Sequence, residues 1–234
     1  MAEILGVKVD AITMIQAVQK VAELVEKKIP SLVATANAEM LMMANSDFEL
    51  QKILNSAAMV VPDGAGTVWA ARHLGYDMPE RVAGVDLVTN LFSKGYKFYF
   101  FGAAEGVAEL AAENAQKKYS AKIVGTRNGF FSADDEPKII SDINNSGADI
   151  LLVGLGVPKQ EKWIFNNLEK LNVAVSIGVG GTFDVLAGKV KRAPRFMQRA
   201  KLEWLFRAML QPSRAGRLLA LPKFVYKVVK SKSD

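Results

Sequence analysis

Residues 150–161 read ILLVGLGVPKQE, a short apolar run that ends in a glycine-rich loop. Every side chain of Ile150–Val153 is apolar, which is typical of a strand in a parallel sheet that helices cover on both faces. The residues after the glycines, Lys159–Leu171, have the spacing of an amphipathic helix. Strand, glycine loop and helix in this order predict one βα unit of an α/β fold.

Short apolar runs and longer amphipathic runs alternate in the same way through the first 190 residues. The expected strands are Ile4–Val9, Leu32–Thr35, Met59–Val61, Lys97–Phe101, Lys122–Thr126, Ile150–Val153 and Ala174–Ile177. The expected helices are Met14–Lys27, Ala38–Ala44, Ala65–Leu74, Val85–Lys94, Val107–Tyr119, Glu136–Asn145 and Lys159–Leu171. This alternation predicts a doubly wound, mainly parallel, Rossmann-like α/β sheet.

The carboxyl-terminal part of the chain differs in pattern and in charge. Residues 191–234 contain 12 Lys and Arg against two acidic residues, a charge of +10, so residues 1–190 carry −4 of the total of +6. Two helices are expected in this tail, Phe196–Leu210 and Leu218–Lys230, and the second carries three lysines on one side. A basic tail on a mildly acidic body indicates an anionic partner: a membrane, a nucleic acid or a phosphorylated substrate. We therefore divide the chain into an α/β core, residues 1–190, and a basic amphipathic helical appendage, residues 191–234.

The composition excludes several kinds of site. The chain of 234 residues has no cysteine, so it has no disulfide and no cysteine-ligated zinc or iron–sulfur centre. Its single histidine, His73, rules out a multi-histidine metal site. The amino terminus lacks the pattern of a signal peptide, and no stretch has the roughly 18–20 uninterrupted apolar residues that span a bilayer. The protein is therefore expected to stay in the cytoplasm.

Ligands of open α/β sheets bind beyond the carboxyl ends of the strands, so the loops that follow the strands are the candidate site. The first loop holds Thr35 and Asn37, which either cap the next helix or offer hydroxyl and amide groups to a sugar. In the second, Asp63 is either a turn or cap residue or a general base at the end of a strand. Arg81 lies in a loop before a helix, where most arginines are simply solvated.

Two glycine-rich loops are candidates to receive a phosphate group. The loop Gly154–Glu161 leads into a helix whose free backbone N–H groups and positive end attract anions. Because Lys159 replaces the third glycine of a dinucleotide fingerprint and no Walker pattern is present, NAD or ATP binding is weakly supported. The loop Gly178–Asp184 precedes three cations within residues 189–192 that can neutralise a diphosphate, unless this segment is only a flexible connector to the tail.

Taken together, these segments resemble the WecG/TagA/CpsF family of glycosyltransferases, glycosyltransferase family 26, over residues 4–194. The segments that carry the resemblance are Thr35-Ala36-Asn37, Pro62-Asp63-Gly64, Arg81-Val82-Ala83-Gly84-Val85-Asp86, Gly154-Leu155-Gly156-Val157-Pro158-Lys159-Gln160-Glu161 and Gly178-Val179-Gly180-Gly181-Thr182-Phe183-Asp184. Each segment is common on its own, whereas the set in this order is specific.

The resemblance implies transfer of a sugar from a UDP donor, with inversion and without a metal or other cofactor, to undecaprenyl-diphosphate-linked N-acetylglucosamine. For the members that this chain looks closest to, the sugar is N-acetylmannosamine and the product is the linkage unit of wall teichoic acid. N-acetylmannosaminuronic acid and glucose are the alternatives. The chain has no Asp-x-Asp pair, which agrees with transfer without a metal. A peripheral enzyme at the inner face of the cell membrane is also implied, and a homo-oligomer is left open.

The resemblance also implies roles for individual residues. Asp63 is the general base, with Thr35, Asn37 and Arg81 around the reacting sugars. The residues implied to hold the UDP-sugar are Gly154, Gly156, Pro158, Lys159, Gln160, Glu161, Gly180, Gly181, Phe183, Asp184 and Lys191. Those implied to contact the lipid diphosphate or the membrane are Arg192, Arg207, Arg214 and Arg217. Arginine and lysine are expected to meet the charge that develops on UDP, since no metal does so.

Two other readings of the sequence compete with a glycosyltransferase. An NAD(P)-dependent oxidoreductase rests only on the α/β pattern and the incomplete Gly154-x-Gly156 loop. A nucleic-acid-binding module rests on the charge of the tail. The tail, however, is rich in Leu, Phe and Val and contains Trp204 and Met209, which suits a bilayer interface better than a phosphate backbone. We therefore expect no nucleic-acid partner.

Overall fold

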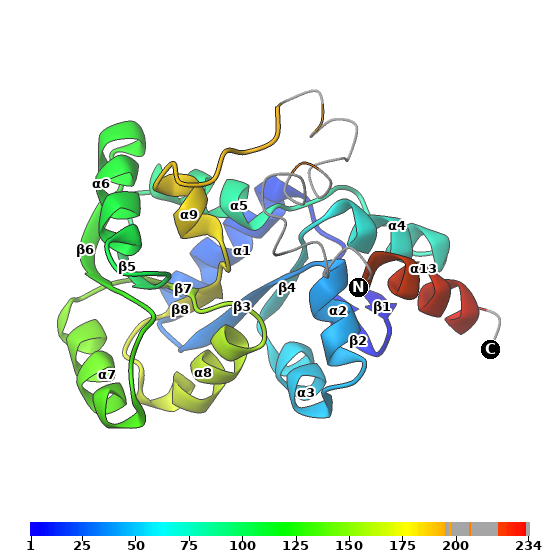
Figure 1. Cartoon of the computed structure of the whole chain (residues 1–234), viewed down its shortest axis with the longest axis horizontal. Helices are drawn as coiled ribbons and strands as arrows, with labels where there is room; N and C mark the ends of the chain where they lie inside the picture. Colours follow the sequence, from blue (N-terminus) through cyan, green and yellow to red (C-terminus); the bar gives the residue numbers. More distant parts are fainter. Residues whose placement is uncertain (195–196, 198–205, 207–219, 233–234) are drawn as a thin grey trace.

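The structure is a computed structural model, and it describes residues 1–194, Met197, Phe206 and residues 220–232. Six parallel strands form one sheet in the order β4-β3-β8-β7-β5-β6 (Figure 1). Their bounds are β3 (Ser31–Ala36), β4 (Met59–Pro62), β5 (Lys97–Gly102), β6 (Lys122–Arg127), β7 (Ile150–Gly154) and β8 (Val175–Gly178). The predicted doubly wound, Rossmann-like sheet is confirmed, and each of these strands coincides with a predicted one to within a residue or two at its ends.

Helices cover both faces of the sheet, as the apolar strands require (Figure 1). One face is covered by α1 (Met14–Lys27), α5 (Gly84–Phe92), α6 (Val107–Tyr119) and α9 (Thr182–Leu186). The other is covered by α2 (Ala38–Ala44), α3 (Phe48–Ser56), α4 (Ala65–His73), α7 (Glu136–Asn145) and α8 (Lys159–Asn167). Short 3-10 turns, η1 (Ala133–Asp135) and η2 (Leu168–Lys170), precede α7 and follow α8.

The central strands are buried on both sides, and aromatic pairs fasten helices to them. Successive side chains of a strand point to opposite faces, so Phe100 and Phe101 of β5 pack in different layers. Phe100 stacks on Phe183 of α9, and Phe101 contacts Trp163 of α8, each pair with 4.8 Å between ring centroids. The two helices that begin at the glycine-rich loops are thereby anchored to the same strand.

The structure corrects the predicted first strand, Ile4–Val9, and adds two helices. Residues 2–9 form an antiparallel hairpin of β1 (Ala2–Ile4) and β2 (Val7–Val9). Leu5 and Gly6 make the turn with φ of 50° and 80°, the left-handed pair that a two-residue hairpin needs. The sequence prediction also missed α3, which Asp47 caps by accepting the N–H of Leu50 (3.0 Å), and α9, which it treated as a loop.

The end of the chain packs on the core. Helix α13 (Ala220–Ser231) coincides closely with the predicted helix Leu218–Lys230 and lies beside α2 and α4 (Figure 1). Phe224 and Val228 are only 1% and 0% exposed, in one cluster with the hairpin, α2 and α4. The predicted helix Phe196–Leu210 lies outside the described residues except for Met197 and Phe206, and the division at residue 190 stays a prediction. No helix within the described part of the chain is long and apolar enough to cross a bilayer.

Candidate active site

The sheet order brings the polar loops to one edge. Strand β3 pairs with β4 on one side and with β8 on the other, and β8 in turn pairs with β7, all in parallel. Because parallel strands end at the same edge, the loops after these four strands meet there. Neighbouring strands lie about 4.8 Å apart, so β4 and β7, three positions apart, are separated by roughly 14 Å.

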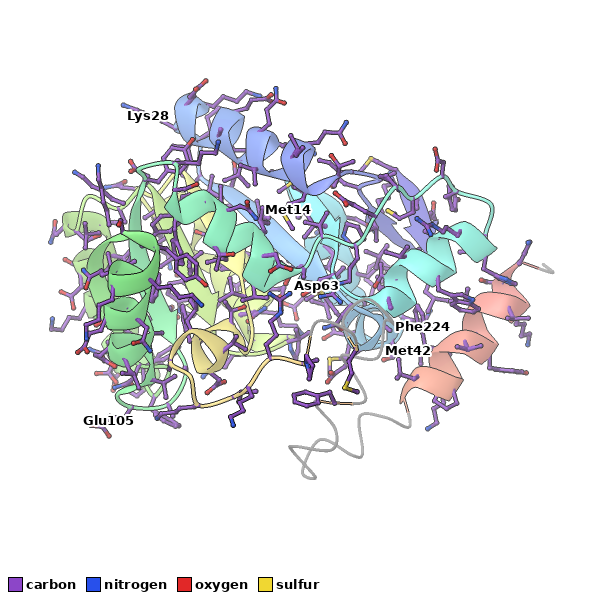
Figure 2. All side chains as sticks on the ribbon, turned by 90° about the horizontal axis from the view of Figure 1, so that it is seen from above. Met14, Lys28, Met42, Asp63, Glu105 and Phe224 are labelled. Carbon is purple, nitrogen blue, oxygen red and sulfur yellow. The ribbon has the colours of Figure 1, made fainter. Side chains whose placement is uncertain are left out.

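Asp63 follows β4 and is held by the backbone. Its N–H donates to the carbonyl oxygens of Ala36 (2.9 Å) and Val61 (3.0 Å). A Cβ atom on residue 84 would lie 3.4 Å from Asp63 Oδ2 and 3.1 Å from Thr35 Cγ2, so glycine lets α5 begin against the carboxylate. The N-cap residue of α5, Ala83, makes no side-chain cap, and the first amides of a helix favour a negative charge nearby. Figure 2 shows Asp63 near the middle of the molecule.

Thr35 and Asn37 both make local hydrogen bonds. The Thr35 hydroxyl is buried and donates to the carbonyl oxygen of Gly178 (2.9 Å), which joins the ends of β3 and β8. Asn37 Oδ1 accepts the N–H of Met40 (3.0 Å), so the helix-cap reading of Asn37 is confirmed. A Cβ atom on Gly64 would lie 3.6 Å from Asn37 Cβ, which places Asn37 beside the Asp63 loop. Contacts of these two side chains with a sugar stay a prediction.

Arg81 lies in the loop that leads into α5 and is partly exposed. The next residue, Val82, donates its N–H to the carbonyl oxygen of Pro62 (3.0 Å), so this loop runs along the end of β4. The structure therefore brings the loops of Thr35, Asp63 and Arg81 together, as the resemblance implies.

A single glutamine joins the two glycine-rich loops. Gln160 Oε1 accepts the N–H of Gly156 (3.2 Å) in the β7–α8 loop and that of Gly180 (3.0 Å) in the β8–α9 loop. Both glycines have positive φ, 79° and 51°, which glycine adopts without strain. Gln160 Nε2 donates to Glu161 Oε1 (2.7 Å). The Gln160 and Glu161 side chains are 1% and 0% exposed, so neither is a solvated residue at a helix entrance.

Burial also changes the ionisation of Glu161. It raises the pKa of this carboxyl group from 4.5 to about 7, and the hydrogen bond from Gln160 opposes only part of the shift. Glu161 Oε2 has no hydrogen-bond partner within the part of the chain that the structure describes. Contact of Glu161 with a donor stays a prediction.

The remaining candidates for the UDP-sugar differ in accessibility. Phe183 is fully buried, and a Cβ atom on Gly154 would lie 2.8 Å from its ring, so this side chain packs the end of β7. Gly181, Lys159 and Lys191 are exposed, and Lys159 Nζ lies 4.6 Å from the centroid of the Phe131 ring. The last of the set, Pro158 and Asp184, are half-buried. Their contacts with a donor stay predictions.

Arg192 is already engaged. It forms a bidentate ion pair with Asp86 in the first turn of α5, with Nη–Oδ distances of 2.5 and 2.6 Å. The chain therefore enters the tail beside α5, the helix that begins against the Asp63 carboxylate. Arg207, Arg214 and Arg217 lie outside the described residues, and the assignment of all four arginines to a diphosphate or membrane stays a prediction.

Sequence reasoning overlooked two further loops at this edge. Ala103, after β5, has a φ of 60° and donates its N–H to the carbonyl oxygen of Gly154 (2.9 Å). Its own carbonyl oxygen accepts the N–H of Gly129 (2.8 Å), after β6. Gly102 directly follows the predicted strand Lys97–Phe101, and Gly129 stands three residues after the predicted strand Lys122–Thr126, which was the available signal. Asp86 was likewise quoted in a motif without a role.

The described residues contain no group of three His, Cys, Asp or Glu side chains that could hold a metal ion. Function without a metal stays a prediction. The fold and the loops at the carboxyl edge of the sheet define a class of protein. It is a Rossmann-like α/β protein with a carboxylate and glycine-rich loops at the carboxyl ends of its strands.

Comparison with known proteins identifies the family. The model of the glycosyl transferase WecG/TagA/CpsF family matches residues 2–234, so the chain belongs to this family of glycosyltransferases, and the match extends through the tail. The N-acetylglucosaminyldiphosphoundecaprenol N-acetyl-beta-D-mannosaminyltransferase of Staphylococcus aureus strain NCTC 8325 / PS 47 is 31% identical over 236 residues. The alignment covers 98% of this chain and 92% of that enzyme, and proteins of the same name from strains COL and MRSA252 give the same figures. The resemblance inferred from the sequence is confirmed.

Proposed function

We propose that this glycosyltransferase moves N-acetylmannosamine from UDP-N-acetylmannosamine to N-acetylglucosamine linked to undecaprenyl diphosphate. The acceptor and the sugar follow the names of its relatives. The observation that carries the proposal is the carboxylate of Asp63, which lies with Thr35 against Gly84 at the start of α5. This is one end of the carboxyl edge of the sheet, and the glycine-rich loops lie at the other end. The product would serve as the linkage unit of wall teichoic acid.

Asp63 acts as the general base in this proposal. The acceptor hydroxyl oxygen attacks the anomeric carbon, the bond from that carbon to the UDP oxygen breaks, and Asp63 takes the hydroxyl proton. The sugar must then lie between Asp63 and the diphosphate, which favours the diphosphate near β7 and β8. There the N-cap residue of α8, Pro158, makes no side-chain cap, and the N–H groups of a helix start favour an anion. Arg81 and Lys191 supply positive charge around the leaving group.

We further propose that α13 helps to place the enzyme at the inner face of the membrane, where the lipid-linked acceptor is embedded. Phe224 and Val228 face the core, whereas Tyr226 is 68% exposed and two valines beside it are over two-fifths exposed. Lysines 223, 227 and 230 are exposed along the same helix, and Lys227 also donates to Asn45 Oδ1. Aromatic, aliphatic and basic side chains on one helix favour an anionic lipid interface.

A donor screen tests the central proposal. The full chain is incubated with undecaprenyl-diphosphate-linked N-acetylglucosamine and one of three donors: UDP-N-acetylmannosamine, UDP-N-acetylmannosaminuronic acid or UDP-glucose. Mass spectrometry of the lipid should show addition of N-acetylmannosamine only. Addition of another sugar would replace the proposed donor, and binding of NADPH without binding of UDP would replace the reaction class. Transfer should continue in EDTA, and loss of activity that Mg²⁺ restores would contradict a reaction without a metal.

Sedimentation with vesicles tests the membrane proposal. Each surface cation contributes about 1 kcal/mol to attraction by an anionic leaflet. Lys223→Gln combined with Lys230→Gln should therefore weaken binding to phosphatidylglycerol vesicles by roughly 30-fold. Lys94→Gln combined with Lys122→Gln, two exposed lysines after α5 and at the start of β6, is the matched control. If both double variants lose vesicle binding equally, only the net charge of the protein matters, and α13 has no docking role.

A further inference from the structure

Gln160 uses its single acceptor atom twice. The side-chain oxygen of an amide offers two lone pairs, and in Gln160 these receive the N–H groups of Gly156 and Gly180 at 3.2 and 3.0 Å. The two glycines belong to different loops, after β7 and after β8. One side chain therefore sets the spacing between two backbone segments that share no other side-chain hydrogen bond among the described residues.

This link works in only one orientation of the amide. If the Gln160 amide rotated by 180°, its NH₂ group would face two N–H donors and both hydrogen bonds would be lost. Glu161 Oε1 accepts the N–H of Gln160 Nε2 at 2.7 Å, and so selects the orientation that is observed. The backbone supports the same arrangement: a Cβ atom on Gly178 would lie 2.8 Å from Gln160 Nε2 and 2.9 Å from Glu161 Oε1.

We propose that Glu161 is a positioning residue for donor binding. It fixes the orientation of the Gln160 amide, and through that amide it holds the β7–α8 and β8–α9 loops at the spacing that receives the diphosphate of a UDP-sugar. Glu161 itself does not touch the donor, because its side chain is completely buried. The inference rests on the proposed function for the nature of the ligand and goes beyond it in the role given to this residue.

The surroundings of Glu161 determine its charge. Strands β3, β7 and β8 pack against α8 and contain no charged residue. At the beginning of α3, Asp47 and Glu49 are both paired with Lys162 of α8, at 2.8 and 2.6 Å, and η2 contributes Glu169 and Lys170. None of these charges perturbs Glu161, whose pKa burial raises to about 7.

The protonation state of Glu161 then affects the ligand. Below neutral pH the carboxyl group is protonated, and it still accepts the Gln160 N–H through Oε1. Above neutral pH it carries a negative charge beneath the loops that receive a diphosphate. Like charges repel, so donor affinity should fall as the pH rises through 7, and a bound diphosphate should favour the protonated form of Glu161.

Calorimetric titration of the full chain with UDP tests the role of Glu161. Glu161→Gln keeps an acceptor for Gln160 without the charge, whereas Glu161→Ala removes the acceptor. We expect Glu161→Ala to bind UDP roughly tenfold more weakly than the native protein at pH 6, and to lose less at pH 8.5, where it also lacks the negative charge. Glu161→Gln should match the native protein at pH 6 and bind several-fold more tightly at pH 8.5. The phosphate of UDP titrates equally with the native protein and with each variant. The difference in UDP affinity between them at each pH therefore reports on residue 161 alone.

Lys162→Gln is the matched control, since it removes the ion pairs of the neighbouring residue on the same helix and should leave UDP affinity unchanged. Circular dichroism confirms that each variant is folded. Native affinity in Glu161→Ala, or parallel pH profiles for the native protein and Glu161→Gln, would overturn the proposal. Failure of the native protein to bind UDP would overturn both proposals, whereas UDP binding without transfer of N-acetylmannosamine would overturn only the proposed function.

Discussion

The two carboxyl groups at the carboxyl edge of the sheet have opposite surroundings. Asp63, at the β4 end, is half-buried and lies against the start of α5. Glu161, near the β7 end, is fully buried with an amide as its partner, and burial raises its pKa to about 7. A helix start favours a charged carboxylate, and burial favours a neutral one. Environment, more than residue type, therefore distinguishes the two carboxyl groups, in line with the proton transfer proposed for Asp63 and the positioning role proposed for Glu161.

The largest expected effect comes from removing the carboxylate of Asp63, the proposed base at the β4 end. Asp63→Asn should lower turnover roughly 10²–10⁴-fold, because the acceptor hydroxyl loses its proton acceptor. UDP affinity should stay within about twofold, since the diphosphate is expected at the other end of the edge. Steady-state kinetics and calorimetry measure the two quantities, and Asp77→Asn, in an exposed loop, is the control. Near-native turnover would reassign Asp63 to a structural turn.

The fold of this edge could be predicted from the sequence, whereas its internal contacts could not. Apolar strands followed by Thr35, Asp63 and the glycines sufficed to predict a parallel sheet with a site at the strand ends. The burial of Gln160 and Glu161 was not predictable, because polar residues at a helix start are normally exposed. It depends on Gly178 of another strand, 17 residues further along the chain, which leaves room for both side chains.

Helix α13 could be predicted from the sequence, but the surface on which it packs could not. The pattern of Phe224, Val225, Val228 and Val229 predicts an amphipathic helix but does not state which surface it covers. Only the tertiary structure shows that Phe224 reaches α4, where a Cβ atom on Gly66 would lie 3.8 Å from its ring. In Figure 2, Phe224 lies near Met42, which packs against the same cluster. The tail is therefore partly a component of the core, and deleting it would damage the fold as well as any membrane contact.

The next largest effect is expected from a substitution in α13, which packs on α4 at the Asp63 end of the edge and should disturb that end more than the glycine-rich end. Phe224→Ala should lower the free energy of unfolding by about 3–5 kcal/mol, as expected for a large buried side chain. Helix α4 begins two residues after Asp63, so turnover should fall more than UDP affinity in the protein that remains folded. Urea unfolding provides the measurement, and Tyr226→Ala, at an exposed position of the same helix, should change the free energy by less than about 0.5 kcal/mol. Equal losses of turnover and UDP affinity would show that the Asp63 end and the glycine-rich end of the edge do not act independently.

A smaller effect is expected from the pH dependence of stability. The pKa of Glu161 is raised from 4.5 to about 7 in the folded protein, so between these values the native state holds a proton that the unfolded chain has lost. Stability therefore decreases as pH rises through this window, by up to about 3 kcal/mol, and no further change comes from this group above it. Glu161→Gln should remove that loss and melt at a higher temperature than the native protein at pH 8.5. Identical melting temperatures at pH 8.5 would contradict the raised pKa.

The smallest expected effect concerns Arg192, which the sequence assigned to the lipid diphosphate and the structure pairs with Asp86. Both side chains are partly exposed, so the pair contributes only about 0–1 kcal/mol to stability, and a diphosphate can compete for the arginine. If Arg192 serves the acceptor, Arg192→Gln should raise the acceptor KM several-fold and leave kcat nearly unchanged. Asp86→Asn removes the competing carboxylate while keeping its shape, and should leave the acceptor KM unchanged or lower. A KM that rises equally in both variants would mean that the ion pair acts only by holding the chain against α5, beside the Asp63 end of the edge.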